Sequence, residues 1–365
     1  MITCTLGWTP KLGWRDSGSV PEAPDLILFF GNGNRLVGET APVHELRRRF
    51  PDTLVAGCST SGEIFQSAVR EDSIVALAVQ FHRSRVRAEL IEVPTPADSF
   101  AAAAELGRRL AQPDLRHVLV LSDGLTVNGT PLTRGFQSTL PPHVSLTGGL
   151  AGDGVRFERT LVGLNGELGP NRVVAIGFYG SNLHVGFGSE GGWEAFGPKR
   201  LVTRSAGNVL YELDGQPALA LYKRYLGDRA EGLPATGLLF PLLMLDKRDT
   251  DDGLVRSILA VDESRQSLTF AGDIPEGHYV RLMKAGLNAL IGGAGTAAER
   301  SEGGPRPAAS SFAVMVSCVG RKIVLGQHVE EEVDAVLHLL GSSTPAVGFY
   351  SYGEICPSKM APCCD

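Results

Sequence analysis

Hydrophobic and polar positions along the chain first predict a strand, a helix and a second strand. An apolar run at 25–30 has the length of a buried strand. Apolar residues then recur at spacings of three and four within 40–50, which predicts an amphipathic helix with Thr40 as its N-cap. Pro51 ends that helix, and a second strand follows at 53–56. This order is a strand-helix-strand unit.

The same order occurs twice more along the chain. The second unit has a strand at 117–121, a helix with Thr130 as N-cap and proline in its first turn, and a strand at 144–146. The third unit has a strand at 312–316 and a helix at 330–340. Three units with one order of elements predict an internally repeated architecture.

Strand-like runs that no helix separates lie between and after these units, and they predict antiparallel sheet. These runs cover 73–81, 85–93, 172–179, 183–187, 209–213 and 254–261. We therefore expect an α+β (mixed α/β) fold, in which repeated strand-helix-strand units and substantial antiparallel sheet form two related domains.

Three segments are expected to connect or extend these elements. The residues up to Pro24 are rich in turn-forming types and are predicted to lie over the surface. A helix at 217–226, apolar on one face, is predicted to join two halves of the molecule. Residues 292–311 are rich in Gly, Ala, Ser and Pro, which predicts a flexible loop.

Each unit ends in a glycine-rich loop with one carboxylate. The stretches GCSTSGEIF (57–65) and GFYSYGEIC (348–356) align without a gap, and TGGLAGDG (147–154) has Gly-Asp where they have Gly-Glu. Such loops at strand ends are common places for ligands. The predicted ligand-binding residues are Ser59, Thr60, Ser61, Gly62, Glu63, Asp123, Gly149, Gly152, Asp153, Arg321, Tyr350, Tyr352, Gly353 and Glu354.

These residues suit a free amino acid or a similar small molecule. Glu63 and Glu354 would hold its ammonium group, while Arg321 and backbone N–H groups would hold its carboxylate. The alternative for each glutamate is to satisfy backbone amides in its own loop. Asp123 precedes a glycine, so it serves either a ligand or a turn, and we expect Asn128 to serve a turn. The sequence leaves open whether the two Gly-Glu-Ile loops share one site.

Catalytic and metal-binding chemistry has less support. A serine nucleophile needs the pattern G-x-S-x-G, and Ser61 stands where the second glycine is required. Cys318 is either a thiol made reactive by a nearby arginine or a small buried hydrophobic residue. The three cysteines near the C-terminus match no C-x-x-C spacing.

We expect no metal, no cofactor and no catalytic residue. The alternative is an enzyme that acts on a small polar metabolite with a loop carboxylate as acid or base.

Composition narrows the class of protein further. The 365 residues are 43% hydrophobic and carry a formal net charge of −6. Arg47 to Arg49 form the densest basic run, which we interpret as a solvated helix face and not as a nucleic-acid contact. The N-terminus lacks an apolar stretch of signal-peptide length, and no run approaches the roughly 18 apolar residues of a membrane helix. We expect a cytoplasmic protein with free thiols and no membrane insertion.

The motifs together resemble the FIST family, whose name joins F-box proteins with intracellular signal transduction. GCSTSGEI, LVLSDGLTVNG and GGLAGDG resemble its N-terminal domain, and FAVMVSCVGRKIVLG with GFYSYGEICP resembles its C-terminal domain. The resemblance predicts an N-terminal extension at 1–24, a FIST N-terminal domain at 25–216 and a FIST C-terminal domain at 217–365. Each motif is weak by itself, whereas their order along the chain is specific.

The resemblance implies a sensory protein that binds small ligands, with amino acids among them. FIST domains occur beside chemoreceptor, kinase and cyclic-dinucleotide modules, and no such module is present in this sequence. A separate signalling protein is therefore the expected partner. The sequence also lacks an F-box. Family members usually continue with a polar strand containing His, Asn and Thr where this sequence stops at Cys363-Cys364-Asp365. A truncation at this point would leave a strand partner missing, and the sequence leaves open whether this is the true terminus.

Overall fold

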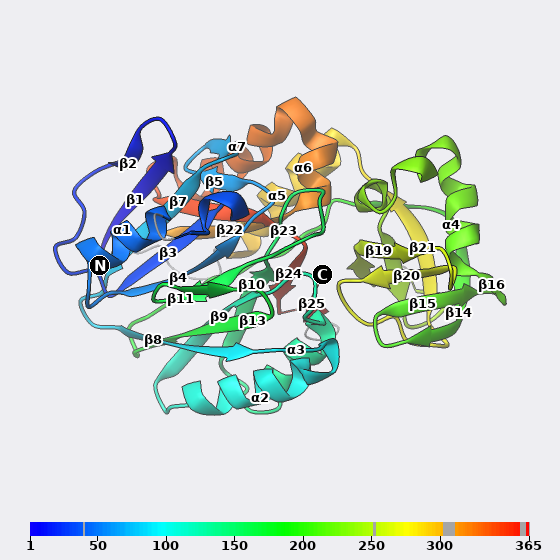
Figure 1. Cartoon of the computed structure of the whole chain (residues 1–365), viewed down its shortest axis with the longest axis horizontal. Coiled ribbons are helices and arrows are strands. Elements are labelled where there is room, and N and C mark those ends of the chain that lie inside the picture. Colours follow the sequence, from blue (N-terminus) through cyan, green and yellow to red (C-terminus); the bar gives the residue numbers. More distant parts are fainter. Residues whose placement is uncertain (39–40, 251–252, 302–310, 358–362, 365) are drawn as a thin grey trace.

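The computed structural model describes residues 1–38, 41–250, 253–301, 311–357 and 363–364. Within them, three sheets form the larger body of the molecule and a fourth, larger sheet forms a smaller lobe beside it (Figure 1). The predicted N-cap Thr40 lies outside the described residues. The mixed α and β fold with repeated strand-helix-strand units that the sequence predicts is confirmed.

The first sheet is built around the first unit. Its parallel strands β3 and β4 are joined by α1 (Pro42–Arg49), and their register places Phe29 opposite Gly57. In order across the sheet, the strands are β12 (Glu167–Gly169), β11 (Val162–Leu164), β4 (Leu54–Ser59), β3 (Leu26–Gly31), β7 (Ile74–Gln80), β1 (Ile2–Thr9) and β2 (Gly13–Asp16).

The second sheet is built around the second unit. Its parallel strands β9 and β10 are joined by α3 (Gly129–Gln137), and α2 (Ser99–Leu110) packs beside α3. In order across the sheet, the strands are β25 (Cys363–Cys364), β24 (Gly353–Cys356), β10 (Ser145–Leu150), β9 (Leu115–Ser122), β13 (Arg172–Tyr179) and β8 (Arg85–Glu92).

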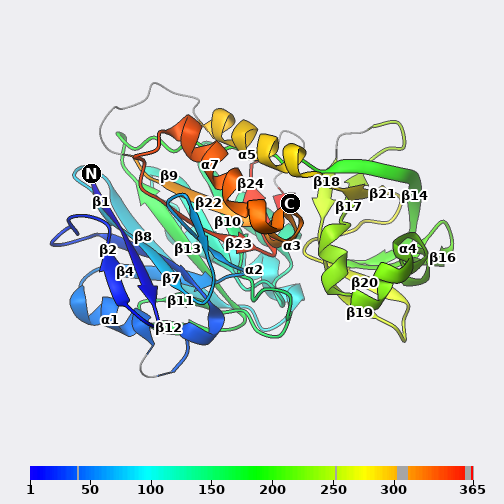
Figure 2. The ribbon, with the colours of Figure 1, turned by 90° about the horizontal axis from the view of Figure 1, so that it is seen from above.

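The third sheet is built around the third unit. In order, its strands are β22 (Ala313–Cys318), β23 (Ala346–Ser351), β5 (Glu63–Phe65) and β6 (Ala68–Arg70). The parallel strands β22 and β23 are joined by α6 (Val319–Leu325) and α7 (Val329–Leu340). Helix α5 (Leu287–Ser301) precedes β22 in the chain and lies beside α7 (Figure 2).

In each unit, the strand that follows the second parallel strand joins the sheet of another unit. After β4 the chain enters β5, which pairs antiparallel with β23 of the third unit. After β23 it enters β24, which pairs antiparallel with β10 of the second unit. After β10 it enters β11, which pairs antiparallel with β4 of the first unit. The three exchanges close a cycle, so the units form one body that none of them can complete alone.

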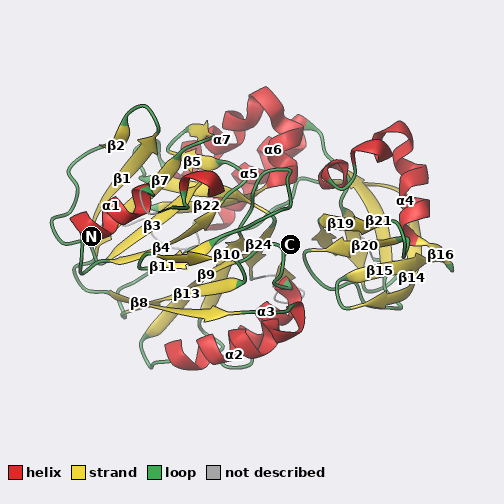
Figure 3. Cartoon of the chain, viewed as in Figure 1, coloured by secondary structure: helices red, strands yellow, loops and turns green. Residues whose placement is uncertain are grey.

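The apolar core lies between the three sheets, and the helices cover their outer faces (Figure 3). Phe30 of the first sheet stacks on Phe349 of the third at 4.7 Å between ring centroids, and Leu121 of the second sheet belongs to the same buried cluster. On the outer faces, α1, α2 with α3, and α7 each pack against the sheet of their own unit. Burial on both faces explains the unbroken apolar runs at 26–30 in β3 and 118–121 in β9.

One glycine in each unit allows the paired parallel strands to approach closely. A Cβ atom on Gly57, Gly148 or Gly348 would lie far inside 3.0 Å of the carbonyl oxygen opposite it, on Phe29, Val120 and Met315 respectively. Real Cβ atoms essentially never come so close. The glycines that introduce the loop motifs therefore have a packing role in the strands.

The smaller lobe is a separate antiparallel sheet with one helix. Helix α4 (Ala218–Leu226) buries Leu219 and Tyr222 against it. In order, the strands are β18 (Leu254–Arg256), β17 (Leu242–Leu245), β21 (Tyr279–Lys284), β14 (Glu194–Ala206), β15 (Val209–Leu213), β20 (Ser267–Phe270) and β19 (Ile258–Asp262), with β16 (Gln216–Pro217) beside β15. The predicted domain division at residue 216 lies at β16, and the chain later returns to the three-sheet body through β22, β23 and β24.

Four local expectations need correction. The segment before Pro24 contains strands β1 and β2 and is not merely a surface cover. Residues 183–187 form no strand, and 292–301 belong to helix α5, while 302–310 of the predicted flexible loop lie outside the described residues. Residues 186–188 pack closely on α5, because a Cβ on Gly186 or Gly188 would collide with the backbone carbonyl oxygen of Ser301 or Ala297.

The fourth correction concerns the cap of α3. Asn128, and not Thr130, is its N-cap, because the Asn128 side chain accepts a hydrogen bond from Thr130 N at 3.2 Å. Asn128 also donates to Asp273 Oδ1 at 2.7 Å, and Thr130 Oγ1 accepts from Asp273 N at 3.0 Å. The beginning of α3 thus joins the three-sheet body to the smaller lobe.

Candidate functional site

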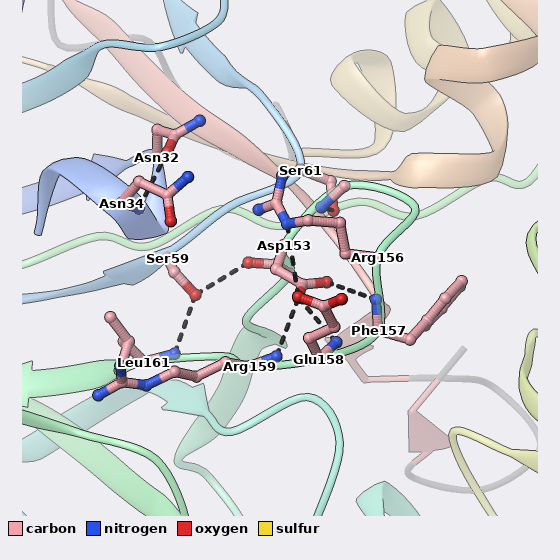
Figure 4. A network of polar contacts seen from close by, with 12 residues as sticks. Asn32, Asn34, Ser59, Ser61, Asp153, Arg156, Phe157, Glu158, Arg159 and Leu161 are labelled. Carbon is pink, nitrogen blue, oxygen red and sulfur yellow. Dashed lines mark hydrogen bonds and ion pairs between the residues drawn. The ribbon is translucent and has the colours of Figure 1, made fainter.

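The strand-end loops of the three units meet and hydrogen-bond to one another. Ser59 Oγ, at the end of β4, donates to Gly152 O at 2.8 Å and accepts from Leu161 N at 2.9 Å (Figure 4). The Gly152 N–H in turn donates to Ser59 O at 3.1 Å. These bonds join the end of β4 to both ends of the loop at 151–161. Ser59 itself is fully buried.

The two Gly-Glu-Ile loops are also in direct contact. Ser61 N donates to Tyr350 O at 2.9 Å, and Tyr350 N donates to Gly62 O at the same distance. Ser61 Oγ accepts from Gly154 N at 3.0 Å, so the third loop joins the same contact. The two glutamates nevertheless lie on different sheets, because Glu63 begins β5 in the third sheet and Glu354 lies on β24 in the second.

Glu63 is a buried carboxylate that accepts hydrogen bonds from two hydroxyl groups and from the backbone of Ser73. Only 1% of the residue is exposed to solvent. Thr60 Oγ1 and Ser73 Oγ each donate to one of its oxygens at 2.6 Å, and no salt bridge involves it within the described residues. Burial outweighs these bonds and raises the pKa of Glu63 to about 7. Glu63 is thus a buried acid that lacks a bonded cation.

Lys322 places a positive charge near this loop, and Arg70, which lies opposite Glu63 in the pair of β5 and β6, places another. From α6, Lys322 Nζ donates to Ser61 O at 2.8 Å and pairs with Glu71, and its charge lowers the pKa of Glu63. A Cβ on Gly62 would lie 2.8 Å from Nζ, so glycine at this position leaves room for the ammonium group. The sequence pattern pointed to the neighbouring Arg321 and missed Lys322, although both lie in α6, which directly follows β22.

Asp153 organises its own loop. Its two oxygens accept hydrogen bonds from the backbone N–H groups of Phe157, Glu158 and Arg159 at 2.9–3.0 Å, and Tyr352 donates its hydroxyl to the same carboxylate. Burial and the Asp153 charge together raise the pKa of the Tyr352 phenol. The carboxylate is 2% exposed, and these four donors occupy its accepting positions.

Asp123 has the same structural character. It accepts from Leu125 N, Thr126 N and Asn171 N at 2.7–3.1 Å, and from Thr160 Oγ1 at 2.7 Å. Three of these donors are backbone amides of loops at the end of the second sheet. The turn interpretation of Asp123 therefore has direct geometric support, and a ligand would have to compete with four bonds.

Arg321 is held inside the protein by a buried ion pair. Its guanidinium donates to Glu332 Oε2 at 2.8 and 3.0 Å, and also to the carbonyl oxygens of Glu190, Gly191 and Leu290. Arg321 is 6% exposed and Glu332 3% exposed. These bonds tie α6 and α7 to the segment before β14 and to α5, so binding a ligand carboxylate would require breaking them.

The remaining predicted residues line the junction between the sheets. Tyr350 is fully buried and donates its hydroxyl to Glu332 Oε1 at 2.6 Å, and burial with the Glu332 charge raises its pKa. Ser351 Oγ donates to Glu354 Oε1. In the pairing of β24 with β10, Gly353 lies opposite Leu150 and Glu354 opposite Gly149.

The thiols near this junction are buried. Burial raises the pKa of Cys318 to about 12, since the nearby Arg321 lowers it by less. Burial likewise raises the pKa of Cys58 above its ordinary value. Both are free cysteines, and the interpretation as small buried hydrophobic residues agrees with this environment. The described residues contain no group of three or more His, Cys, Asp or Glu side chains that could hold a metal ion.

A cavity of about 640 Å³ lies away from these loops, at the amino ends of β9 and β10. Residues 140–146, 183–187 and 355–357 form most of its wall. A second, smaller cavity of about 360 Å³ lies beside Asp334 and His338. Neither of these two cavities is lined by a predicted site residue.

A buried histidine lies behind the larger cavity. Ser145, which lines the cavity, hydrogen-bonds to His117 Nδ1 at 2.7 Å, and Thr147 Oγ1 lies 3.0 Å from Nε2. Burial lowers the pKa of His117 to about 4, so the imidazole is neutral at physiological pH. With a hydroxyl at each ring nitrogen, His117 is a satisfied interior side chain.

Comparison with known proteins gives two family matches and a distant relative. The FIST N domain matches residues 25–216 and the FIST C domain matches residues 218–357. FIST domains are sensory domains of signal transduction that bind small ligands. An uncharacterized protein of Methanocaldococcus jannaschii is 22% identical over 85% of this chain, which spans 65% of the length of that relative.

One solved structure is similar only at a low level. A crystal structure of a chorismatase aligns with 78% of this chain and 98% of its own, at 12% identity and a TM-score of 0.24. That score is too low to support an argument about fold or activity. Among the described residues, no helix has both the length and the apolar character needed to cross a membrane.

Proposed function

Because the chain belongs to the FIST family of sensory domains, we propose that it senses an amino acid or a similar small molecule that carries an ammonium group. Among the strand-end residues that the sequence singles out, Glu63 is the one that supports this proposal most directly. It is a buried acid with hydroxyl donors and no bonded cation. A ligand ammonium supplies the missing charge and favours the ionised carboxylate.

Lys322 provides the matching site for the ligand carboxylate. Its present carboxylate partner, Glu71, is strongly exposed, with 74% of its side chain accessible. Exposed ion pairs are worth little, roughly 0–1 kcal/mol, so a ligand carboxylate can replace Glu71 at low cost. Glu63 and Lys322 then hold the two charged ends of one zwitterion. Arg321 has no part in this version of the site, because Glu332 holds its guanidinium.

The signal arises from the contacts that the same loop makes with the other units. Occupation of the site moves the Thr60–Gly62 segment, in which Ser61 and Gly62 bond to the loops at 151–161 and 350–354. Such a shift reaches all three sheets and changes the surface that a separate signalling protein reads. We place this exchange in the cytoplasm, where the buried thiols Cys4, Cys58 and Cys318 stay reduced.

A binding experiment tests the proposal. The wild-type protein is titrated calorimetrically with the 20 amino acids, and each ligand that binds is compared with its N-acetyl derivative, which lacks the ammonium charge. We expect Glu63→Gln and N-acetylation each to weaken binding by about tenfold or more, since each removes one buried charge interaction. The matched control is Glu158→Gln, an exposed acid in the neighbouring loop. Equal binding of the acetylated ligand would contradict the proposal.

A second candidate function follows from the pKa of the same group. A carboxyl group with a pKa of about 7 is suited to general acid-base catalysis at neutral pH. We therefore propose, as the alternative, an enzyme that acts on a small polar metabolite with Glu63 as acid or base. Mass spectrometry of bound ligands after incubation distinguishes the two: a chemically changed ligand with the wild type, and an unchanged one with Glu63→Gln, supports catalysis. An unchanged ligand with both proteins supports sensing.

A further inference from the structure

Glu63 is almost completely buried, so a ligand reaches it only after a covering segment moves away. Only 1% of the residue is exposed. The connection between β6 and β7, residues 70–73, lies against this carboxylate, and we name it the strap. It crosses from the third sheet, which contains β6, to the first sheet, which contains β7.

Two residues of the strap face Glu63. Ser73 donates its hydroxyl to Glu63 Oε2 at 2.6 Å and its backbone N–H to the same carboxylate. Arg70 lies opposite Glu63 in the pair of β5 and β6, and its guanidinium carbon is 4.0 Å from the centre of the Phe65 ring. The strap thus supplies hydrogen bonds to Glu63 that a ligand ammonium would have to replace.

The two residues between them form ion pairs at the surface. Glu71 pairs with Lys322 at 2.5 Å, and Asp72 pairs with Arg35 through two bonds at 2.6 and 2.8 Å. The side chains of Glu71 and Asp72 are 74% and 55% exposed. Exposed ion pairs are weak and are screened by salt, so these two contacts can open at low cost.

The strap lies between a short edge strand and a buried interior strand. β6 has three residues, and in the sheet order of the described residues it pairs only with β5. On its outer edge, Val69 N donates to the side chain of Glu330 at 3.1 Å. β7 has seven residues and pairs with β3 and β1, and Ser73 O accepts from Asn32 N at 3.0 Å. The strap is therefore firmly held at Ser73 and weakly held on the side of β6.

Glu71 occupies the place that the proposed function gives to the carboxylate of the ligand. Both carboxylates pair with Nζ of Lys322, which also donates to Ser61 O at 2.8 Å. A ligand carboxylate at Lys322 therefore competes with Glu71. When the ligand binds, it releases one of the two ion pairs that hold the strap.

We propose that the strap is an autoinhibitory closure of the Glu63 site, held by the Glu71–Lys322 and Asp72–Arg35 ion pairs. The carboxylate of the ligand displaces Glu71 from Lys322, the strap opens on the side of β6, and the ammonium group then reaches Glu63. This inference rests on the proposed function and adds how the same site is closed and opened.

Hydrogen exchange resolved to single amides tests the strap without a ligand. The reporter is the Ser73 amide, because it donates to Glu63. The double variant Glu71→Gln with Asp72→Asn removes both ion pairs, and asparagine tolerates the φ of +56° at position 72 as aspartate does. We expect the Ser73 amide to exchange about fivefold faster in this variant, and faster in the wild type at about 0.5 M than at about 0.05 M NaCl.

Matched controls separate strap opening from general loosening of the fold. Asp114→Asn removes an equally exposed ion pair, to Arg85, on the second sheet. It should leave the exchange of the Ser73 amide unchanged. The amide of Val75, inside β7, should exchange at one rate in all three proteins. Equal Ser73 exchange in the wild type and the double variant, or a change in Val75 that matches the change in Ser73, would overturn the proposal.

Calorimetry with the 20 amino acids tests the competition at Lys322. Glu71→Gln should bind an amino acid about threefold more tightly than the wild type, because the internal carboxylate is gone, and Asp114→Asn should bind it as the wild type does. Unchanged or weaker binding by Glu71→Gln would overturn the role of Glu71. If no amino acid binds to any of these proteins, the proposed function fails, whereas the exchange of the Ser73 amide still decides whether the strap opens.

Discussion

Glu63 lies opposite Phe349 in the antiparallel pair of β5 and β23, so the end of the first Gly-Glu-Ile stretch pairs with the beginning of the second. Glu354 of the second stretch lies opposite Gly149, in the strand that leads into the Gly-Asp loop. The similarity of the stretches thus reflects a cyclic exchange of strands among three units. The same exchange brings the strand-end loops into contact.

The glycines that open the two Gly-Glu-Ile stretches should be required for folding. Gly348→Ala places a Cβ atom against Met315 O, a backbone atom that cannot move without disturbing β22. We expect a loss of about 3 kcal/mol or more in the free energy of unfolding, measured by urea denaturation. Gly18→Ala is the control, because a Cβ there meets nothing within 4 Å, and it should change stability by less than about 0.5 kcal/mol. Equal stability of the two variants would contradict the assigned packing role.

Asp153 should stabilise the loop at 151–161 and not bind ligand directly. Asp153→Ala removes the acceptor of three backbone N–H groups and of the Tyr352 hydroxyl. We expect a destabilisation on the order of 3 kcal/mol. Glu158→Ala, an exposed acid in the same loop, should be nearly neutral. A variant of Asp153 that keeps its melting temperature but loses a ligand would restore the binding role that the sequence predicted.

Arg321 should behave as half of a buried ion pair. Arg321→Met leaves Glu332 buried without its cation, which costs about 3–5 kcal/mol. The double variant Arg321→Met with Glu332→Gln should recover part of that loss, because the uncompensated charge is gone. Thermal unfolding of the single and double variants measures this coupling. Full additivity of the two changes would show that the pair is not coupled.

Glu63 should make stability depend on pH with a defined sign. Its pKa is about 7 in the folded protein against an ordinary value of 4.5. The folded state therefore binds more protons than the unfolded state between these values, and the stabilisation present below 4.5 is lost as pH rises through about 7. Relative to Glu63→Gln, the wild type should lose on the order of 3 kcal/mol between about pH 5 and pH 8.

The comparison with Glu63→Gln isolates this group from other titrations. Burial lowers the pKa of His117 to about 4, so His117 acts in the opposite direction and destabilises the folded state as pH falls below 6.5. That effect is common to both proteins and cancels in the difference between their unfolding free energies. Parallel pH profiles for the two proteins would contradict the raised pKa of Glu63.

The local pattern of the sequence predicted much of the fold. The apolar runs became β3, β4, β9 and β22, and the helix expected at 330–340 is α7, because continuous apolar runs and helical spacing report burial directly. What the sequence could not predict is the exchange of β5, β11 and β24 between sheets. Those strands have three or four residues, and their pairing is decided by contacts far away in the sequence.

Segments of small residues misled the prediction for a physical reason. Residues 292–301 contain few large side chains, yet they are helical in α5, where Gly293 lies close to the backbone of Gly192. The apolar residues at 183–187 were expected to form a strand, but this segment runs against α5 without pairing. Close packing of a helix on an extended segment leaves no periodic signal in either.

For the candidate site, the sequence indicated the loops but not the state of each side chain. It identified Glu63, Asp123 and Asp153 together, whereas the structure separates a carboxylate bonded to hydroxyls from two that accept three backbone amides each. Such differences depend on which hydroxyl and backbone donors the folded loops bring to each carboxylate. Lys322 was missed for the same reason, since its contact with Ser61 O spans 261 residues.

The central claim, that Glu63 holds the ammonium group of a small ligand, is tested most directly by a crystal structure with the amino acid that binds best in calorimetry. We predict the ligand nitrogen within about 3 Å of a Glu63 carboxylate oxygen, and the ligand carboxylate beside Lys322 Nζ. A ligand found instead in the cavity beside Ser145, with the Glu63 loop unchanged, would contradict the claim and move the sensory site to the amino ends of β9 and β10.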